Sequence, residues 1–268
     1  MPPTVKDILD IIEIIAPAKL AESWDNVGLM IGRPTAPVDK ILLGLDPTPS
    51  LLDEAAALGS NVVITHHPII FHPLKSVQLE QPDGRFIDKA IRKKINIISC
   101  HTNLDSTSEG VSDALAIQIG LEQTEPLVAH SSLENTIGLG RIGNLPTPIP
   151  SADFIKRLKA ACSPPWLLGA GSPPEQITRV AICGGSCSEL AETALRHGAQ
   201  VFVTAEVKHS IARWAEQAGL WIIDAGHFAT ENPAMKQLAR QLAEETEKHF
   251  NSIDIIVTTQ QRSALNII

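Results

Sequence analysis

The sequence predicts an α/β protein of two similar lobes, each a mostly parallel sheet flanked by helices. Short apolar runs of strand length alternate with segments of helical periodicity, and this order occurs twice along the 268 residues. Hydrophobic residues make up 44% of the chain and charged residues 19%, which argues for a large buried core and against disorder. A chain of this length exceeds the usual single domain, so we expect two lobes.

The first copy of the pattern follows an N-terminal helix. Thr4 and Asp7 have the spacing of a capping box, and apolar residues then recur at helical spacing until Pro17 ends the helix. The next segments predict a strand, a helix and a second strand: 40–45, 50–58 and 61–65. Such a unit implies parallel strands.

The same order returns at a constant offset of 139 residues, which aligns Gly59 with Gly198 and Thr65 with Thr204. The second copy again has a strand, a helix and a strand: 179–183, 188–197 and 199–204. A third strand follows in each copy: 95–100 and 221–225. We interpret the repeated order as an internal duplication.

A segment rich in Pro and Gly, 122–150, is expected to connect the copies, with a strand over 133–142 as an alternative. We therefore place the first lobe at 1–125 and the second at 126–268. A helix over 233–249 and a last strand over 253–258 close the chain. These two elements either stay with the second lobe or pack back on the first.

Composition excludes several classes of protein. The chain has 22 Lys and Arg against 30 Asp and Glu, a net charge of −8, which argues against general nucleic-acid binding. No apolar run reaches the length of a membrane span, and acidic residues interrupt the N-terminal apolar segment, so we expect neither a membrane protein nor a signal peptide. The four cysteines lack zinc-ribbon spacing and do not form a secreted disulfide framework. We expect a cytoplasmic protein.

Three polar clusters follow predicted strands, at the edge of an α/β sheet where ligands bind. They are His66 with His67, His101 with Asp105, and His227 with Glu231. A His and a carboxylate four residues apart share one face of a helical turn and can reach one ion. Taken alone, the His66–His67 pair fits a capped strand end better than a metal site, and each of the other two clusters fits a polar helix start equally well. Their recurrence at corresponding strand ends favours a metal site.

The number of candidate ligands indicates two metal ions. His66, His67, Asp105, His227 and Glu231 exceed the three protein ligands of a mononuclear catalytic zinc, and His101 is a sixth candidate. Paired ions about 3.5–4 Å apart can activate water for hydrolysis. Imidazole and carboxylate ligands suit zinc, manganese, iron, cobalt or nickel without distinguishing among them.

Five ordered motifs resemble the GTP cyclohydrolase 1 type 2 homologues, also called Nif-three-like proteins. The motifs lie at 22–29, 65–68, 101–105, 204–209 and 226–231, and the resemblance runs from about Pro3 to Ile268. It implies a two-lobed α/β protein that assembles as a toroidal homohexamer. It also implies a dinuclear metal site in each subunit, held by the ligands named above. Cys187 departs from the family pattern, because the family more often has Gly at the end of the segment 184–187.

Other polar residues near these motifs have two interpretations each. Glu206 and His209 are candidate catalytic proton carriers, or else ordinary surface residues. Trp24 and Asp25 either close the pocket or are a core Trp and a turn Asp. The Gly-rich segment 184–186 fits a tight turn that only Gly permits better than a phosphate site.

The sequence thus favours a dinuclear divalent-metal-dependent hydrolase that acts on a nucleotide or a similar polar small molecule. The family name implies opening of the imidazole ring of GTP, although no guanine-binding or triphosphate motif is evident. The alternative is a non-catalytic metal-binding ring scaffold or a chaperone-like interaction protein.

Overall fold

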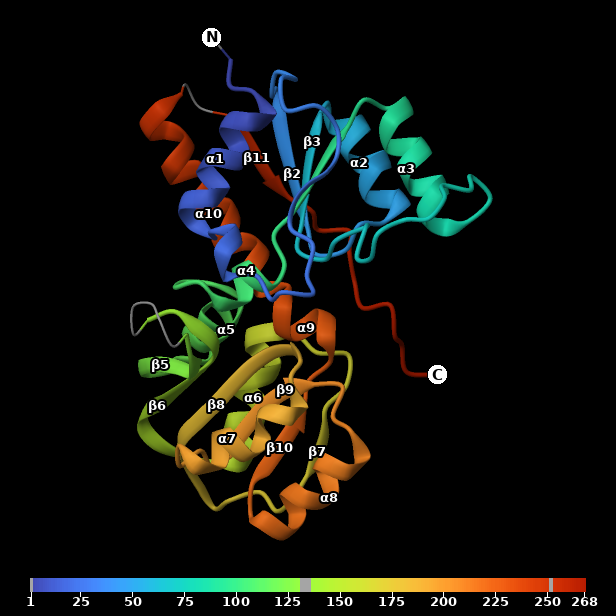
Figure 1. Cartoon of the computed structure of the whole chain (residues 1–268). Helices are drawn as coiled ribbons and strands as arrows, with labels where there is room; N and C mark the ends of the chain where they lie inside the picture. Colours follow the sequence, from blue (N-terminus) through green and yellow to red (C-terminus); the bar gives the residue numbers. More distant parts are fainter. Residues whose placement is uncertain (1, 131–135, 251–252) are drawn as a thin grey trace. The chain divides into compact units, whose positions relative to one another are not determined.

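The computed structural model describes residues 2–130, 136–250 and 253–268. The chain forms two compact units. The first unit comprises 1–104 and 235–261, and the second comprises 105–234 and 262–268. Each unit contains one sheet with helices on both faces (Figure 1). Among the described residues, no helix is both long and apolar enough to cross a membrane.

The sheet of the first unit has five strands in the order β1-β4-β3-β2-β11. The strands are β1 (Gly28–Ile31), β2 (Lys40–Gly44), β3 (Val62–Thr65), β4 (Asn96–Ser99) and β11 (Asp254–Val257). Four of them are parallel, and β1 joins the edge antiparallel to β4. Burial on both faces explains why β2, β3 and β4 have apolar residues at consecutive positions.

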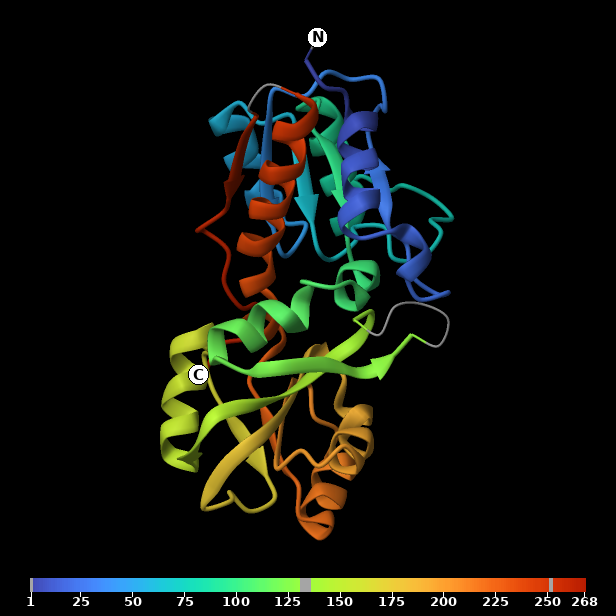
Figure 2. The same cartoon turned by 90° about the vertical axis from the view of Figure 1, so that its left-hand side faces the viewer.

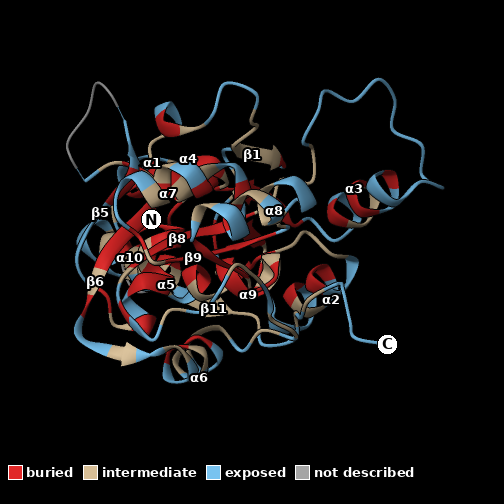
Figure 3. Cartoon of the chain, turned by 90° about the horizontal axis from the view of Figure 1, so that it is seen from below, coloured by how far each residue is buried: buried red, intermediate tan, exposed pale blue. Residues whose placement is uncertain are grey.

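Helices cover both faces of this sheet, with α1 and α10 on one side and α2 and α3 on the other (Figures 1 and 2). The helices in this part of the chain are α1 (Val5–Ile15), η1 (Ala18–Leu20), α2 (Pro49–Leu58), α3 (Pro82–Arg92), α4 (Thr102–Ser106) and α10 (Pro233–His249). The capping box of α1 forms as predicted, because the backbone N–H of Asp7 donates to Thr4 Oγ1 at 3.3 Å and the Thr4 N–H donates to Asp7 Oδ2 at 2.7 Å. The outer faces of α2 and α3 are exposed, while their inner faces are buried (Figure 3).

The second unit has a six-stranded sheet in the order β5-β6-β8-β9-β10-β7. Its strands are β5 (Glu122–Ala129), β6 (Gly138–Pro150), β7 (Leu168–Ala170), β8 (Gln176–Ser186), β9 (Val201–Ala205) and β10 (Trp221–Asp224). Only β8, β9 and β10 are parallel to one another. The strands β5, β6 and β7 pair antiparallel, so this sheet is mixed. The prediction of mostly parallel sheets was therefore wrong for the second unit.

Helices cover both faces of the second sheet. The helices are α5 (Val111–Ile119), α6 (Ser151–Cys162), η2 (Ser188–Leu190), α7 (Ala191–Arg196), α8 (His209–Ala218) and α9 (His227–Glu231). One core layer contains Phe154 of α6 against Val180 and Val203 of the sheet. The other packs Ala194 and Ala215, from α7 and α8, against Phe202.

The segment predicted to connect the lobes forms part of the second sheet instead. Strands β5 and β6 pair across 122–150, and β6 continues the sheet to β8. Proline is tolerated in β5 because β5 is an edge strand, and Pro146 and Pro148 fall where the β6–β8 register shifts between Asn144 and Ile149. Of the strand expected over 133–142, residues 133–135 lie outside the described residues, 136–137 precede β6, and 138–142 form its first part.

Consequently the units differ from the lobes expected at 1–125 and 126–268. The chain enters the second unit at Asp105, because α5 packs on β6 and β8. Most of α10 and all of β11 belong to the first unit, where β11 pairs with β2. This is the alternative in which the C-terminal elements pack back on the first lobe.

The two sheets share an arrangement of four strands. In the first unit the order is β1-β4-β3-β2, and in the second β7-β10-β9-β8. The first strand is antiparallel in both, and the other three are parallel. Leu43 pairs with Ile64 in one sheet, and Ile182 pairs with Val203 in the other, which are equivalent positions at the offset of 139. The common topology agrees with a duplication, which itself stays a prediction.

Candidate metal centre

Polar residues of the first unit meet at the carboxyl edge of its parallel strands. Gly44 pairs with Thr65, and Thr65 pairs with Ser99, so β2, β3 and β4 end level with one another. The residues that follow these ends are Asp46 after β2, His66 and His67 after β3, and His101 after β4. The sheet register therefore brings together imidazoles that lie up to 35 positions apart in the sequence.

His66, His67 and His101 form one cluster. Each offers a ring nitrogen, and these three nitrogens lie within 4.8 Å of one another. The ring centroid of His66 lies 5.0 Å from that of His67 and 5.1 Å from that of His101, and the latter two are 5.6 Å apart. His66 is buried, and the other two are partly buried. The structure thus contains a group of histidines that could bind a metal ion.

The Nδ1 atom of each histidine in this cluster has an oxygen partner. His66 Nδ1 lies 2.8 Å from the carbonyl oxygen of Cys100. His67 Nδ1 lies 2.7 Å from Asp46 Oδ1, and His101 Nδ1 lies 2.8 Å from Asp25 Oδ1. Carbonyl and carboxylate oxygens only accept hydrogen bonds, so we assign the proton to Nδ1, which makes Nε2 the ring nitrogen that carries a lone pair.

Asp46 was absent from the predicted site. Its position directly after the strand 40–45 was the available signal, because the other two strands end in the same way at His66 and His101. Gln261 fixes the backbone here: its Oε1 accepts from Leu45 N at 2.7 Å, and its Nε2 donates to Asp46 O at 2.6 Å. No pattern in the sequence indicated this contact across more than 200 residues.

Asp25 supports His101 in a different way. Its second oxygen accepts a hydrogen bond from the backbone N–H of Thr102 at 3.0 Å and another from the Thr102 hydroxyl. Burial by itself would raise the pKa of Asp25, but the hydrogen bonds from His101 and Thr102 outweigh it and hold that pKa well below its ordinary value. Asp25 therefore stays ionised beside His101.

A second candidate group lies in the second unit on α9. His227 begins this helix and Glu231 ends it, and their Nε2 and Oε1 atoms lie 3.1 Å apart. The spacing of four residues thus places both side chains on one face, as predicted. His227 Nδ1 lies 2.8 Å from Glu206 Oε1, which repeats the oxygen contact of the first unit. Glu206 has a φ of 54°, a conformation that a residue other than Gly adopts only at a cost.

The segment Gly184-Gly185-Ser186 gives the carboxylate of Glu231 its space. Gly185 has a φ of +72°, and a Cβ there would lie 2.2 Å from Glu231 Oε1 and 3.3 Å from His227 Nε2. The amide of Gly185 donates to Thr230 Oγ1 at 3.0 Å, and that of Gly184 donates to Ser112 Oγ at 3.3 Å. These amides are used within the fold, which disfavours a phosphate site.

The remaining candidate ligand and the remaining candidate proton carrier lie on α4 and α8. Asp105 is partly buried on α4, one helical turn after His101. His209 is exposed at the first residue of α8. Burial raises the pKa of the Cys100 and Cys162 thiols to about 12, so neither is a ready thiolate ligand.

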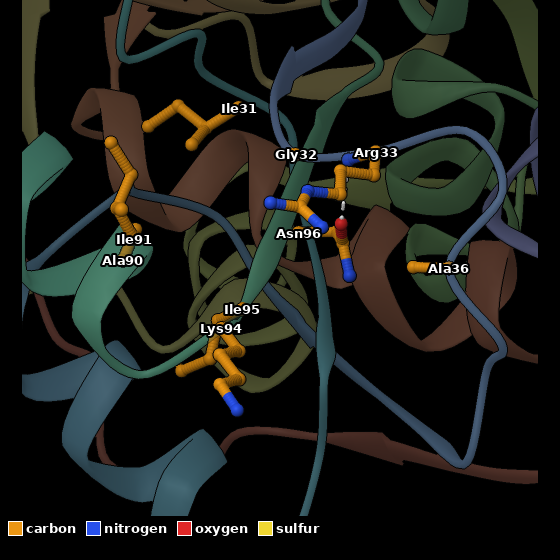
Figure 4. A pocket seen from close by; sticks show the side chains of 9 residues that line it. All are labelled: Ile31, Gly32, Arg33, Ala36, Ala90, Ile91, Lys94, Ile95 and Asn96. Carbon is orange, nitrogen blue, oxygen red and sulfur yellow. Dashed lines mark hydrogen bonds between the residues drawn. The ribbon is translucent and has the colours of Figure 1, made fainter.

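A cavity of about 490 Å³ lies at the other edge of the first sheet, where β1 ends and β4 begins (Figure 4). Arg33, Lys94 and Asn96 line it together with apolar side chains. Asn96 starts β4, whereas His101 follows the opposite end of the same strand. This cavity is therefore separate from the histidine cluster.

Comparison with known proteins identifies the family. The family model described as Duf34/NIF3 (NGG1p interacting factor 3) matches residues 3–263. The chain belongs to the Duf34/NIF3 family. Duf34/NIF3 relatives named GTP cyclohydrolase 1 type 2 homolog include one from Clostridium acetobutylicum, 32% identical over 254 residues that span 95% of each chain. Another, from Streptomyces coelicolor, is 33% identical and covers 92% of this chain and 88% of its own. The resemblance drawn from the five motifs is confirmed.

Solved Duf34/NIF3 structures have the same fold. A Bacillus cereus protein related to NIF3 superimposes with a TM-score of 0.93 at 25% identity. Staphylococcus aureus protein SA1388 gives a TM-score of 0.92 at 28% identity. Both superpositions cover 100% of this chain and 100% of the solved structure.

Proposed function

We propose that this Duf34/NIF3 protein is a dinuclear divalent-metal-dependent hydrolase that acts on a nucleotide or a similar polar small molecule. The ligands would be His66, His67, Asp105, His227 and Glu231, with His101 as a sixth. Relatives with about one third identity carry the name GTP cyclohydrolase 1 type 2 homolog, which supports a nucleotide substrate.

One observation supports the metal site above all others. Four histidines from two units each have Nδ1 within 2.8 Å of an oxygen: His66, His67, His101 and His227. Metal-binding histidines typically donate the second ring N–H to a carboxylate or a carbonyl, which fixes the ring and the tautomer. Solvated surface histidines have no reason to share this arrangement. The donor set therefore fits divalent transition metals.

We propose that ligands from both units complete a single pair of sites. The chain passes from the first unit to the second between Leu104 and Asp105, and it returns between Ala234 and Met235. Both crossings lie within four residues of candidate ligands, Asp105 itself and Glu231. The covalent chain therefore limits how far these two carboxylates can lie from the first unit.

The residues of the chain would have distinct roles in this reaction. Bound ions would supply Lewis-acid activation of water and of the substrate. Asp25, Asp46 and Glu206 would orient the imidazoles. Glu206 was predicted as a proton carrier, but its contact with His227 favours an orienting role. His209, also predicted as a proton carrier, keeps that role as a proposal.

The alternative remains a metal-binding ring scaffold or a chaperone-like interaction protein without catalysis. For either function we propose a homohexamer, on the basis of the family resemblance, and a cytoplasmic location, supported by four free cysteines. Light scattering at micromolar concentration tests the assembly. A hexamer is expected, and a monomer would contradict the proposal.

The decisive experiment combines metal analysis with a nucleotide panel. Purified protein loaded separately with each of the five metals is expected to hold two ions per chain and to hydrolyse at least one nucleotide. A His66→Ala variant should lose metal and turnover together, while an Ile14→Ala control, exposed on α1, should retain both. Two bound ions without turnover of any panel member would favour the scaffold. One ion at saturation would contradict the dinuclear site.

A further inference from the structure

Two exposed aromatic side chains lie beside the histidine cluster of the first unit. Trp24 is 54% exposed and Phe71 is 38% exposed. Their ring centroids are 5.6 Å apart, and they lie 6.1 and 6.0 Å from the ring of His101. Of the two interpretations of Trp24, a core Trp is therefore wrong. Large aromatic side chains are usually well buried, so a pair that is exposed at a candidate site requires an explanation.

Hydrogen bonds on both sides of Trp24 hold it in this place. Asp25 accepts from Thr102 N at 3.0 Å and contacts His101 Nδ1 at 2.8 Å. Before it in the chain, the Glu22 N–H donates to Thr102 Oγ1 at 2.9 Å. After it, Asn26 Nδ2 donates to the carbonyl oxygen of Ile70, the neighbour of Phe71, at 2.5 Å. The residues that flank Trp24 are thus tied to both α4 and the segment after His67, while the indole itself stays exposed.

We propose that Trp24 and Phe71 form a stacking surface for a planar heteroaromatic ring of the substrate. This inference rests on the proposed function and specifies its substrate class as a nucleoside phosphate or a similar base-bearing anion. Aromatic side chains stack on any base because every base has a π-face. The ring of Trp24 lies 6.1 Å from that of His101, so a base stacked on Trp24 would lie close to the candidate metal ligands. The sugar and phosphate attached to that base would then extend to those ligands.

The polar groups nearby favour a ring over an apolar peptide partner. The Asp25 carboxylate lies 2.8 Å from His101 Nδ1, and the histidine cluster follows directly, so the aromatic surface is short and bounded by polar groups on that side. A planar base with polar edges suits such a boundary better than an aliphatic side chain does, because its edges can remain hydrated. The ring planes of Trp24 and Phe71 are inclined by 47°, so we assign the stacked base to the indole face and an edge contact to Phe71.

The test measures binding, so that it does not depend on turnover. Four metal-loaded proteins would be titrated by calorimetry with GMP, AMP and ribose 5-phosphate. They are the wild type, Trp24→Ala, Trp24→Phe and Ile14→Ala, and their metal content is first confirmed as equal. Ile14 is 60% exposed on α1 and serves as the control. We expect Trp24→Ala to weaken the binding of GMP and AMP by about tenfold or more and to leave ribose 5-phosphate nearly unchanged. Trp24→Phe should retain most of the affinity.

Three results of the binding experiments would overturn the stacking surface. These are equal losses for all three ligands, no loss for any, or a Trp24 fluorescence that responds to protein concentration and not to nucleotide. The last result would assign the surface to contact between copies of the chain. Failure of the proposed function is distinguishable, because in that case GMP would bind through Trp24 without any metal-dependent turnover. Conversely, turnover only of substrates that lack a ring would contradict the stacking surface and spare the hydrolase.

Discussion

The carboxylate of Glu231 occupies the space that a side chain on Gly185 would need: a β-carbon there would lie 2.2 Å from Glu231 Oε1. We predict that Gly185→Ala displaces this carboxylate and lowers the metal content. The variant should also lose about 1–2 kcal/mol of unfolding free energy, because Gly185 has a φ of +72°. Elemental analysis and denaturant unfolding measure the two effects.

Gly219→Ala is the matched control for this substitution. Gly219 has a φ of +79°, but a Cβ there would meet nothing within 4 Å. Its backbone cost should therefore resemble that of Gly185→Ala, while its metal content stays at the wild-type value. Equal metal loss in both variants would show that backbone strain, and not the contact with Glu231, was responsible.

Asp25→Asn tests the orientation of His101. The amide preserves the shape of the side chain but removes the negative charge beside His101 Nδ1. We predict a loss of metal affinity of roughly 10- to 100-fold, as is typical when the partner of a metal-binding histidine is changed. Competition with a chelator measures it. Asp53→Asn is the control, because Asp53 forms an exposed ion pair with Lys89 on the same unit. A full retention of affinity in Asp25→Asn would remove Asp25 from the site.

Metal occupancy should fall with pH below about pH 6, because imidazole must be neutral to bind a metal and ordinarily protonates near pH 6.5. Asp25 does not contribute to this change. Its pKa is lowered in the folded protein, so the stability that it provides is present above its unfolded pKa and is lost only as pH falls below about 4. Dialysis against metal buffers from pH 7.5 to 5 measures the metal occupancy. Unfolding of the metal-free protein over the same range measures the stability that does not depend on metal. Loss of stability by the metal-free protein near pH 6 would contradict this assignment.

The shared site is tested by a double variant. If ligands from both units hold the same ions, Asp105→Ala and Glu231→Ala should each deplete metal and lower stability through loss of bound ligand. The double variant should then lose less than the sum of the single losses, because coupled residues do not add. Full additivity, with each single variant keeping half the metal, would refute the shared site and leave the family assignment intact.

Arg141 is predicted to be essential to the second unit for a reason unrelated to metal. It is only 2% exposed, and its Nε donates to Asp113 Oδ1 at 2.6 Å. Arg141→Met leaves Asp113 without its cation and should cost about 3–5 kcal/mol of unfolding free energy. Arg179→Met, which removes an exposed pair with Glu125, should cost no more than about 1 kcal/mol. Similar losses in the two variants would contradict the role of burial.

Local patterns in the sequence were sufficient for much of the fold. The apolar runs at 40–45 and 61–65 predicted β2 and β3, and the capping residues Thr4 and Asp7 predicted the start of α1. These features depend on residues a few positions apart, where the periodicity of a helix or a strand is legible. The polar clusters after the strands were visible for the same reason. The segment 122–150 was predicted mainly as a connection because its Pro and Gly residues are typical of loops, and only the alternative strand over 133–142 anticipated part of β6, which pairs with β5 and β8.

The sequence by itself determined the family and which histidines and carboxylates are candidate ligands. The tertiary structure alone decided what holds them. Asp25 contacts His101 across 76 positions, Asp46 contacts His67 across 21, and Glu206 contacts His227 across 21. The space that Gly185 leaves for Glu231 likewise joins two segments 46 residues apart. Such contacts follow from sheet register and close packing, which bring together side chains that no local periodicity relates.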